Sequence, residues 1–126
     1  MADIRILIVE DSPAMRMLMG RAVARLPGVT GFDEAADGAE ALRKLQSTTY
    51  ALVIVDINIP VLDGLKLIER IRASDKTRDA KVIVVTTDSA ESDRKRAMDL
   101  GADAYLLKPI QLADLTAAIE QALLDR

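Results

Sequence analysis

The strongest constraint on the fold of this chain comes from five short segments with strand-like sequences, of which residues 4–9, 51–55 and 81–85 are the most apolar and β-branched. Runs of this composition are typical of strands that are buried on both faces of a sheet. The run at residues 32–36 is the weakest of the set. The predicted strands are residues 4–9, 32–36, 51–55, 81–85 and 103–107.

A helix is predicted in the segment that follows each run: four of these segments have apolar side chains at helical spacing, and the segment ending at Leu100 is a polar helix. Ser12 followed by Pro13 is typical of a helix start, and Leu26-Pro27-Gly28 is expected to end that first helix. Ser89 is expected to cap the fourth helix. The predicted helical segments are residues 15–26, 41–45, 65–71, 89–100 and 112–123.

Regular alternation of strands with helices indicates an α/β fold. Because a parallel connection needs a crossover, the sheet should be parallel and covered by helices on both faces. The length of 126 residues is that of one domain, so we expect a single domain over residues 1–126.

Composition excludes several kinds of site. The chain has no cysteine and no histidine, which rules out disulfides, thiolate or imidazole metal ligands and a histidine general base within it. A net charge of −3 and the absence of Trp argue against a nucleic-acid surface. No apolar run approaches the ~20 residues of a membrane span, so we expect a cytoplasmic protein with no membrane insertion.

Polar side chains stand at the carboxyl ends of four predicted strands: Glu10-Asp11, Asp56, Thr86-Thr87 and Lys108. In an open parallel sheet these ends share one edge, where ligands bind. Clustered carboxylates repel one another unless a cation joins them. Oxygen ligands without sulfur or imidazole select Mg²⁺ or Mn²⁺. The sequence therefore predicts a magnesium site at this edge.

The same residues, in the same order, resemble the motif set of response-regulator receiver domains, CheY-like in type. The resemblance covers essentially the whole chain and extends to Asn58, Tyr105 and Pro109. It implies a flavodoxin-like (βα)5 three-layer sandwich with a five-stranded parallel sheet in the order 2-1-3-4-5. It also implies a phosphorylated switch in two-component signalling, which catalyses only its own phosphorylation and dephosphorylation.

Site roles follow from this resemblance. Asp56 would be the nucleophile and the phosphorylated residue. Asp56 and Asp11 would bind Mg²⁺ directly, with the Asn58 backbone carbonyl as a further ligand and Glu10 acting through water. Lys108 would pair with the phosphoryl oxygens as a point charge.

The resemblance implies a switch as well. The Thr86 hydroxyl would turn toward the phosphoryl group, and Tyr105 would fill the space it leaves. This would alter the face built by the fourth helix, fifth strand and fifth helix. The Lys108–Pro109 peptide bond would be cis.

Some positions depart from the family pattern or vary within it. Thr87 is bulkier than the usual small residue and would narrow access to the phosphoryl group. Ile110 replaces a frequent aromatic residue, which affects packing. Asn58 and Asp88 lie where family members tune autodephosphorylation.

Since the chain has no histidine, the phosphoryl donor would be a histidine kinase or histidine phosphotransfer protein acting in trans. A downstream protein would read the altered face, with the chain a monomer or a weak dimer through that face. The chain would be either a stand-alone regulator or the receiver part of a longer one.

Two other functions fit the same fold class. A haloacid-dehalogenase-type phosphatase also forms an aspartyl phosphate, but its second Asp would correspond here to Asn58, which cannot serve as an acid. A flavodoxin-like cofactor binder would need a Ser/Thr/Gly-rich phosphate loop after the first strand, where Glu10-Asp11 stands instead.

Overall fold

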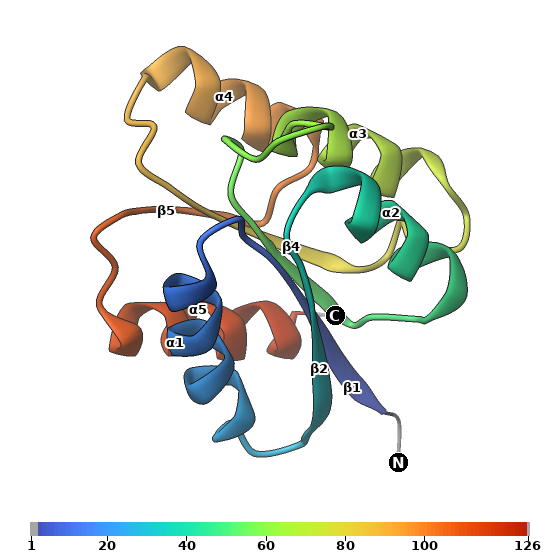
Figure 1. The fold of residues 1–126 in the computed structure, drawn as a ribbon, viewed down its shortest axis with the longest axis vertical. Helices are drawn as coiled ribbons and strands as arrows, with labels where there is room; N and C mark the ends of the chain where they lie inside the picture. The colour runs from blue at the N-terminus through green and yellow to red at the C-terminus, as the bar shows by residue number, and fades with distance from the viewer. Residues whose placement is uncertain (1–2, 126) are drawn as a thin grey trace.

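Strands and helices alternate along the chain in the computed structural model, which describes residues 3–125 (Figure 1). This confirms the predicted alternation. The strands are β1 (Ile4–Val9), β2 (Val29–Ala35), β3 (Leu52–Val55), β4 (Lys81–Thr86) and β5 (Ala104–Leu107). The helices are α1 (Pro13–Ala24), α2 (Gly38–Ser47), α3 (Gly64–Ala73), α4 (Glu91–Leu100) and α5 (Leu112–Leu124).

All neighbouring strands pair in parallel, in the order β2-β1-β3-β4-β5. The expected flavodoxin-like sheet is confirmed. The chain passes from β1 outward to β2 and then crosses back to β3 on the other side of β1. The loops that follow β1 and β3 therefore diverge, and this point is where ligands bind in sheets of this kind.

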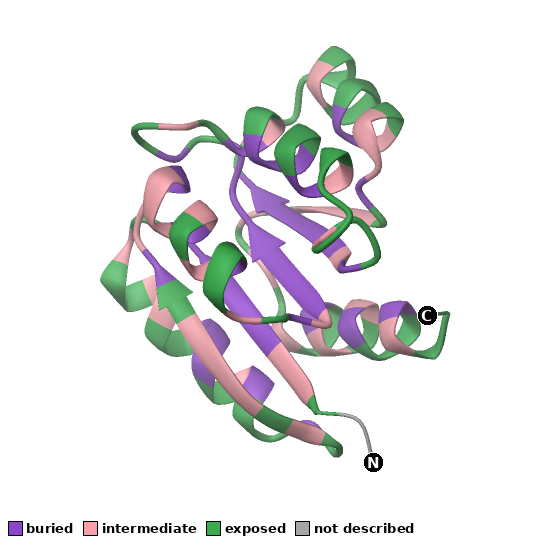
Figure 2. Ribbon diagram, turned by 90° about the vertical axis from the view of Figure 1, so that its right-hand side faces the viewer, coloured by how far each residue is buried: buried purple, intermediate pink, exposed green. Residues whose placement is uncertain are grey.

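Two apolar layers hold helices against the sheet. Helices α1 and α5 cover one face and α2, α3 and α4 cover the other (Figure 1). The central strands are buried on both sides (Figure 2), as their uninterrupted apolar sequences predict. Met19, Leu115 and Ile119 anchor the first layer, and Leu67 and Ile68 anchor the second.

Strand β2 begins at Val29, earlier than the predicted residue 32. It is an edge strand and only partly buried, so its first residues lack the apolar pattern on which the prediction relied. A register shift between Ile4 and Arg5 also lets the pairing start early, with Ile4 opposite Val29.

The two predicted helix caps have different outcomes. The Ser12 prediction is confirmed, since its Oγ accepts a hydrogen bond from the Met15 amide at 3.3 Å. The Ser89 prediction is wrong, because Ala90 is the N-cap of α4 and makes no side-chain cap bond. The Asp88 carboxylate accepts the Ala90 amide at 2.9 Å instead, which moves the start of the helix one residue further along.

An ion pair ties the edge strand to the centre of the sheet. Asp33 of β2 accepts hydrogen bonds from Arg5 Nε at 3.0 Å and Nη2 at 2.8 Å, and from the Tyr50 hydroxyl at 2.6 Å. The hydrogen bond from Arg5 lowers the pKa of Asp33. Burial, and then the bond to Asp33, raise the pKa of Tyr50 to about 12.

We expect Asp33→Asn to lower the melting temperature at pH 7 by roughly 2–5 °C, because the charged acceptor of both partners is lost. The folded-state pKa of Asp33 lies below its ordinary value of 3.8, so the unfolded chain takes up the proton first as the pH falls. The stabilisation is therefore present above about pH 4 and is lost at lower pH. Urea unfolding at pH 7 and pH 3.5 checks this, and an equal gap between wild type and variant at both values would contradict it.

Candidate functional site

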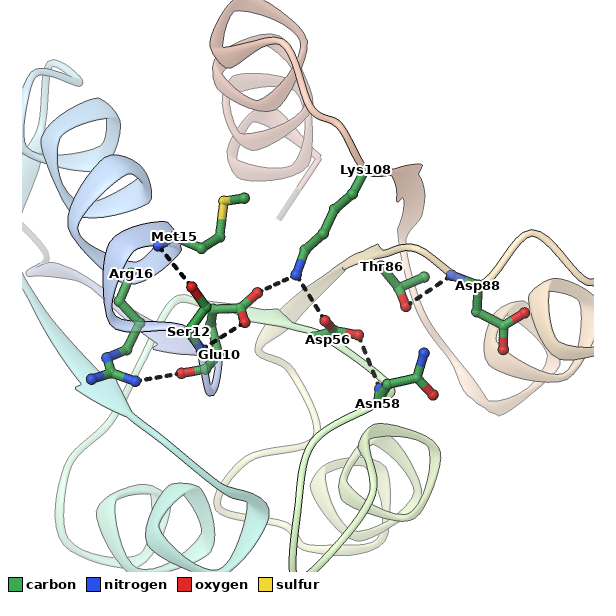
Figure 3. A network of polar contacts seen from close by, with 9 residues as sticks. All are labelled: Glu10, Ser12, Met15, Arg16, Asp56, Asn58, Thr86, Asp88 and Lys108. Atoms are coloured by element: carbon green, nitrogen blue, oxygen red, sulfur yellow. Dashed lines mark hydrogen bonds and ion pairs between the residues drawn. The ribbon is translucent and has the colours of Figure 1, made fainter.

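Four strands deliver polar side chains to one edge of the sheet (Figure 3). Glu10 follows β1, Asp56 follows β3, Thr86 ends β4 and Lys108 follows β5. Glu10, Asp56 and Thr86 are the buried polar residues of the described chain, at 1%, 6% and 0% exposure. Polar groups are rarely buried without a partner, so their bonds define what the site can do.

Lys108 lies between the two buried carboxylates. Its Nζ is 2.5 Å from Glu10 Oε1 and 2.9 Å from Asp56 Oδ2 (Figure 3). Residues that are 98 and 52 positions apart in sequence therefore meet at one ammonium group. Two carboxylates face a single cation, which leaves a net negative charge in a largely desolvated position.

The ammonium stays charged in this setting. Burial alone would lower the pKa of Lys108, but the hydrogen bonds to Glu10 and Asp56 outweigh burial and raise it above its ordinary value. The side chain is only 13% exposed. At neutral pH it is therefore a fixed positive charge beside the Asp56 carboxylate.

Backbone amides hold the other carboxylate oxygens. Asp56 Oδ1 accepts the Asn58 amide at 2.9 Å, and Glu10 Oε2 accepts the Ser12 amide at 3.0 Å. Arg16 donates to the Glu10 carbonyl oxygen at 2.7 Å and fixes the loop that follows β1. These contacts depend on how the loops turn and could not be predicted from residue type alone.

Close packing sets the position of the β3–α3 loop (residues 56–63). Helix α3 begins at Gly64, where a Cβ would lie 2.5 Å from the Ile57 Cα and 2.6 Å from the Asp56 carbonyl oxygen. Only glycine permits this approach. Asp63 is the N-cap of α3 and accepts the Lys66 amide at 3.0 Å, and Gly64 lets the helix pack against the end of β3.

Thr86 and Tyr105 both bond to the loop after β4. The buried Thr86 Oγ1 accepts the Asp88 amide at 3.2 Å. The half-buried Tyr105 donates its hydroxyl to the Asp88 carbonyl oxygen at 2.7 Å. Burial, and then the charges of Asp88 and Asp93, raise the pKa of Tyr105, so it remains a donor. The two proposed switch residues thus share one backbone partner.

The remaining predicted residues lie within two positions of these side chains in the sequence. Asp11, Asn58 and Thr87 are exposed, and Asp88 is partly buried. The Lys108–Pro109 peptide bond is cis. Ile110 packs in the apolar layer under α1 and α5.

The oxygen atoms at this edge suit a hydrated magnesium ion, which does not need a preformed cage of protein ligands. Within residues 3–125 no three acidic, histidine or cysteine side chains come close enough to form such a cage. Mg²⁺ commonly takes only one or two carboxylates and keeps several waters. Among the described residues, nothing donates a hydrogen bond to the Asn58 carbonyl oxygen, which leaves it open as a ligand beside Asp56 and Asp11.

Comparisons with known proteins agree on one family. The sequence model of the protein family 'Response regulator receiver domain' matches residues 6–120 of this chain. The chain is 39% identical over 124 residues to the transcriptional regulatory protein PrrA of Mycobacterium leprae, covering 97% of this chain and 50% of that protein. It spans about half the length of most of the curated relatives it matches.

Solved structures show the same fold. A CheY-like receiver domain protein from Methanospirillum hungatei matches with a TM-score of 0.90 at 28% identity, covering 98% of this chain and 96% of that one. The chemotaxis response regulator CheY4 of Vibrio cholerae matches with a TM-score of 0.87 at 25% identity, covering 96% and 99%.

No helix within residues 3–125 is both long and apolar enough to cross a membrane. The family match covers most of the chain, and the fold and sheet order are those of its structural neighbours. The chain belongs to the response-regulator receiver domains of two-component signal transduction.

Proposed function

We propose that this receiver domain takes a phosphoryl group from a histidine donor onto Asp56 in a Mg²⁺-dependent reaction. The observation that carries the proposal is the Lys108 ammonium, held 2.9 Å from Asp56 Oδ2 and 2.5 Å from Glu10. A buried carboxylate beside a fixed cation is prepared for a reaction in which further negative charge arrives. The chain has no histidine, so the donor acts in trans.

The transfer needs positioning more than covalent chemistry. An Asp56 carboxylate oxygen forms a bond to phosphorus while the phosphorus–nitrogen bond to the donor histidine breaks, and the electron pair returns to the imidazole. Lys108 exchanges its contact with Asp56 Oδ2 for one with a phosphoryl oxygen. Release occurs when water attacks phosphorus, which yields inorganic phosphate and restores the carboxylate.

Asp11, Asp56 and the Asn58 carbonyl would hold the metal, with Glu10 acting through water. When bound, Mg²⁺ (or Mn²⁺) supplies charge neutralisation across the carboxylate and phosphoryl oxygens. Asp11 is exposed and so can reach a hydrated ion. Glu10 keeps Lys108 in place throughout, because it shares the ammonium with Asp56.

Thr86 is the proposed sensor of phosphorylation. Its hydroxyl turns toward a phosphoryl oxygen as a donor, and its present bond with the Asp88 amide is lost. Because Tyr105 bonds to the same residue, the change reaches the face built by α4, β5 and α5. A downstream protein binds this altered face. The domain itself is a monomer or a weak dimer that forms through the same face.

The proposal covers residues 1–126 as one receiver domain in the cytoplasm. It is a signalling protein whose only reactions are its own phosphorylation and dephosphorylation. The setting is either a stand-alone regulator or the receiver part of a longer one. The structural match to CheY4 supports the first setting, and the extra length of PrrA supports the second.

We expect Asp56→Ala to abolish the mass gain of one phosphoryl group after treatment with acetyl phosphate and Mg²⁺, because the acceptor oxygen is absent. Intact-mass spectrometry measures this directly. Asp79→Ala, which removes an exposed carboxylate from a distant loop, is the matched control and should be phosphorylated like wild type. A phosphorylated Asp56→Ala protein would reject the acceptor assignment.

We expect Thr86→Ala to bind beryllofluoride but to lose the resulting change in amide hydrogen exchange along α4, β5 and α5, because the hydroxyl that transmits the change is gone. Thr86→Ser should restore the change. Thr49→Ala is the matched control, since its side chain is exposed in the loop between α2 and β3, away from the site. A full response in Thr86→Ala would disprove the coupling.

We expect Asn58→Ala and Asp88→Ala each to slow the decay of the phosphorylated protein by roughly threefold to tenfold. This is the effect of losing about one hydrogen bond to the attacking water. Ser89→Ala changes an exposed neighbour and should leave the rate unaltered. The decay is measured as the release of inorganic phosphate. An unchanged rate in both test variants would count against this role.

A further inference from the structure

Val61 in the β3–α3 loop has an unfavourable backbone conformation. Its φ of 72° is the only positive value at a non-glycine residue within residues 3–125. The Leu62 amide donates to the Pro60 carbonyl oxygen at 2.9 Å and closes a three-residue turn around it. This is the strained form of the γ-turn, and a β-branched residue is poorly suited to it.

The Val61 side chain contributes little to the packing of this chain. It is 81% exposed, more than any other large apolar side chain in the described region. Its neighbours Ile59 and Leu62 both pack in the core. The turn itself is needed to bury those neighbours, yet Gly or Asn at position 61 would form it with less strain. An apolar side chain kept at such a position points to a contact outside the chain.

The turn is fixed relative to Asp56. The Pro60 carbonyl oxygen also accepts the Gly38 amide at the start of α2, at 3.3 Å. A Cβ at Gly38 would overlap the Leu62 carbonyl oxygen, so the turn and the helix are in close contact. The other end of the loop is held by the bond from the Asn58 amide to Asp56. Val61 is therefore an exposed apolar side chain on a loop that is held in place at both ends, close in sequence to Asp56.

We propose that Val61 is a docking contact for the protein that donates the phosphoryl group, packing against an apolar patch beside the donor histidine. This inference rests on the proposed function of Asp56. The donor histidine has to come within bonding distance of Asp56, so its protein must cover the loops at this edge. A downstream target does not have to approach Asp56 and so need not cover these loops. A small phosphoryl donor such as acetyl phosphate is too small to contact Val61 while it reacts with Asp56.

The test compares two donors on the same variants: acetyl phosphate with Mg²⁺, and a phosphorylated histidine phosphotransfer protein chosen because it phosphorylates the wild-type chain. Val61→Gly and Val61→Asn remove the apolar contact and keep the turn. Val61→Leu keeps an apolar side chain and is the rescue variant. Leu124→Ala, which shortens a similarly exposed apolar side chain at the end of α5, is the matched control.

With the protein donor, we expect the Gly and Asn variants to lose roughly fivefold to tenfold in kcat/KM, mostly through KM, as for the loss of one buried apolar side chain from an interface. The Leu variant and the Leu124→Ala control should stay within about twofold of wild type, and every variant should react normally with acetyl phosphate. The Asn variant should also melt about 2–5 °C higher, because the backbone strain is relieved.

Unchanged transfer from the protein donor in both the Gly and Asn variants would overturn the proposal. So would an equal loss with acetyl phosphate, which would place Val61 in the chemistry of the site. Weaker binding of a downstream protein with normal transfer would assign the contact to the target instead. Failure of acetyl phosphate to modify wild type is a different result, and it would reject the proposed function itself.

Discussion

The buried ammonium of Lys108 is the interaction on which the rest of the site depends. Without it, the buried Glu10 and Asp56 would stand at the ends of neighbouring strands with no cation between them. The Lys108 Nζ lies 2.5 Å from Glu10 and 2.9 Å from Asp56 and forms an ion pair with each. Removing one member of such a group leaves an uncompensated buried charge, which is more costly than never having built the group. In the proposed function, the same cation would also pair with an incoming phosphoryl group.

The loop after β3 shows how backbone packing supports this arrangement. Gly64 brings α3 against the end of β3, and Gly38 brings α2 against the turn at Pro60. Both contacts leave no room for a Cβ, so the loop has little freedom to move. A reaction that depends on positioning gains from this rigidity, because the nucleophile is held in place before its partner arrives. Strain at Val61 is the local cost of the same construction.

Sequence patterns predicted the elements whose burial is strong and uniform. Strands β1, β3 and β4 have continuous apolar sequences because both their faces are covered, and their ends located the polar site. Partly exposed elements were less predictable: β2 is an edge strand without such a pattern, and the start of α4 is set by a bond to Asp88 rather than by Ser89. The contact of Arg16 with Glu10 and the turn at Val61 depend on three-dimensional loop geometry, for which residue type gives no signal.

Helix α4 is attached to the domain unequally at its two ends. At its carboxyl end, Arg72 donates to the Gly101 carbonyl oxygen at 2.8 and 3.1 Å, to the Ala80 carbonyl oxygen at 2.6 Å and to Asp103 at 3.1 Å. At its amino end, Ala90 provides no side-chain cap, and the only buried residue of the whole helix is Ala97. A shift of the loop at Asp88 would therefore meet little resistance at the near end of α4, while Arg72 holds the far end through two charge-assisted bonds to Gly101. In the proposed switch, this asymmetry would favour a pivoting of α4 over a displacement of the whole helix, and it would direct a small change at Thr86 toward the surface that Tyr105 adjoins.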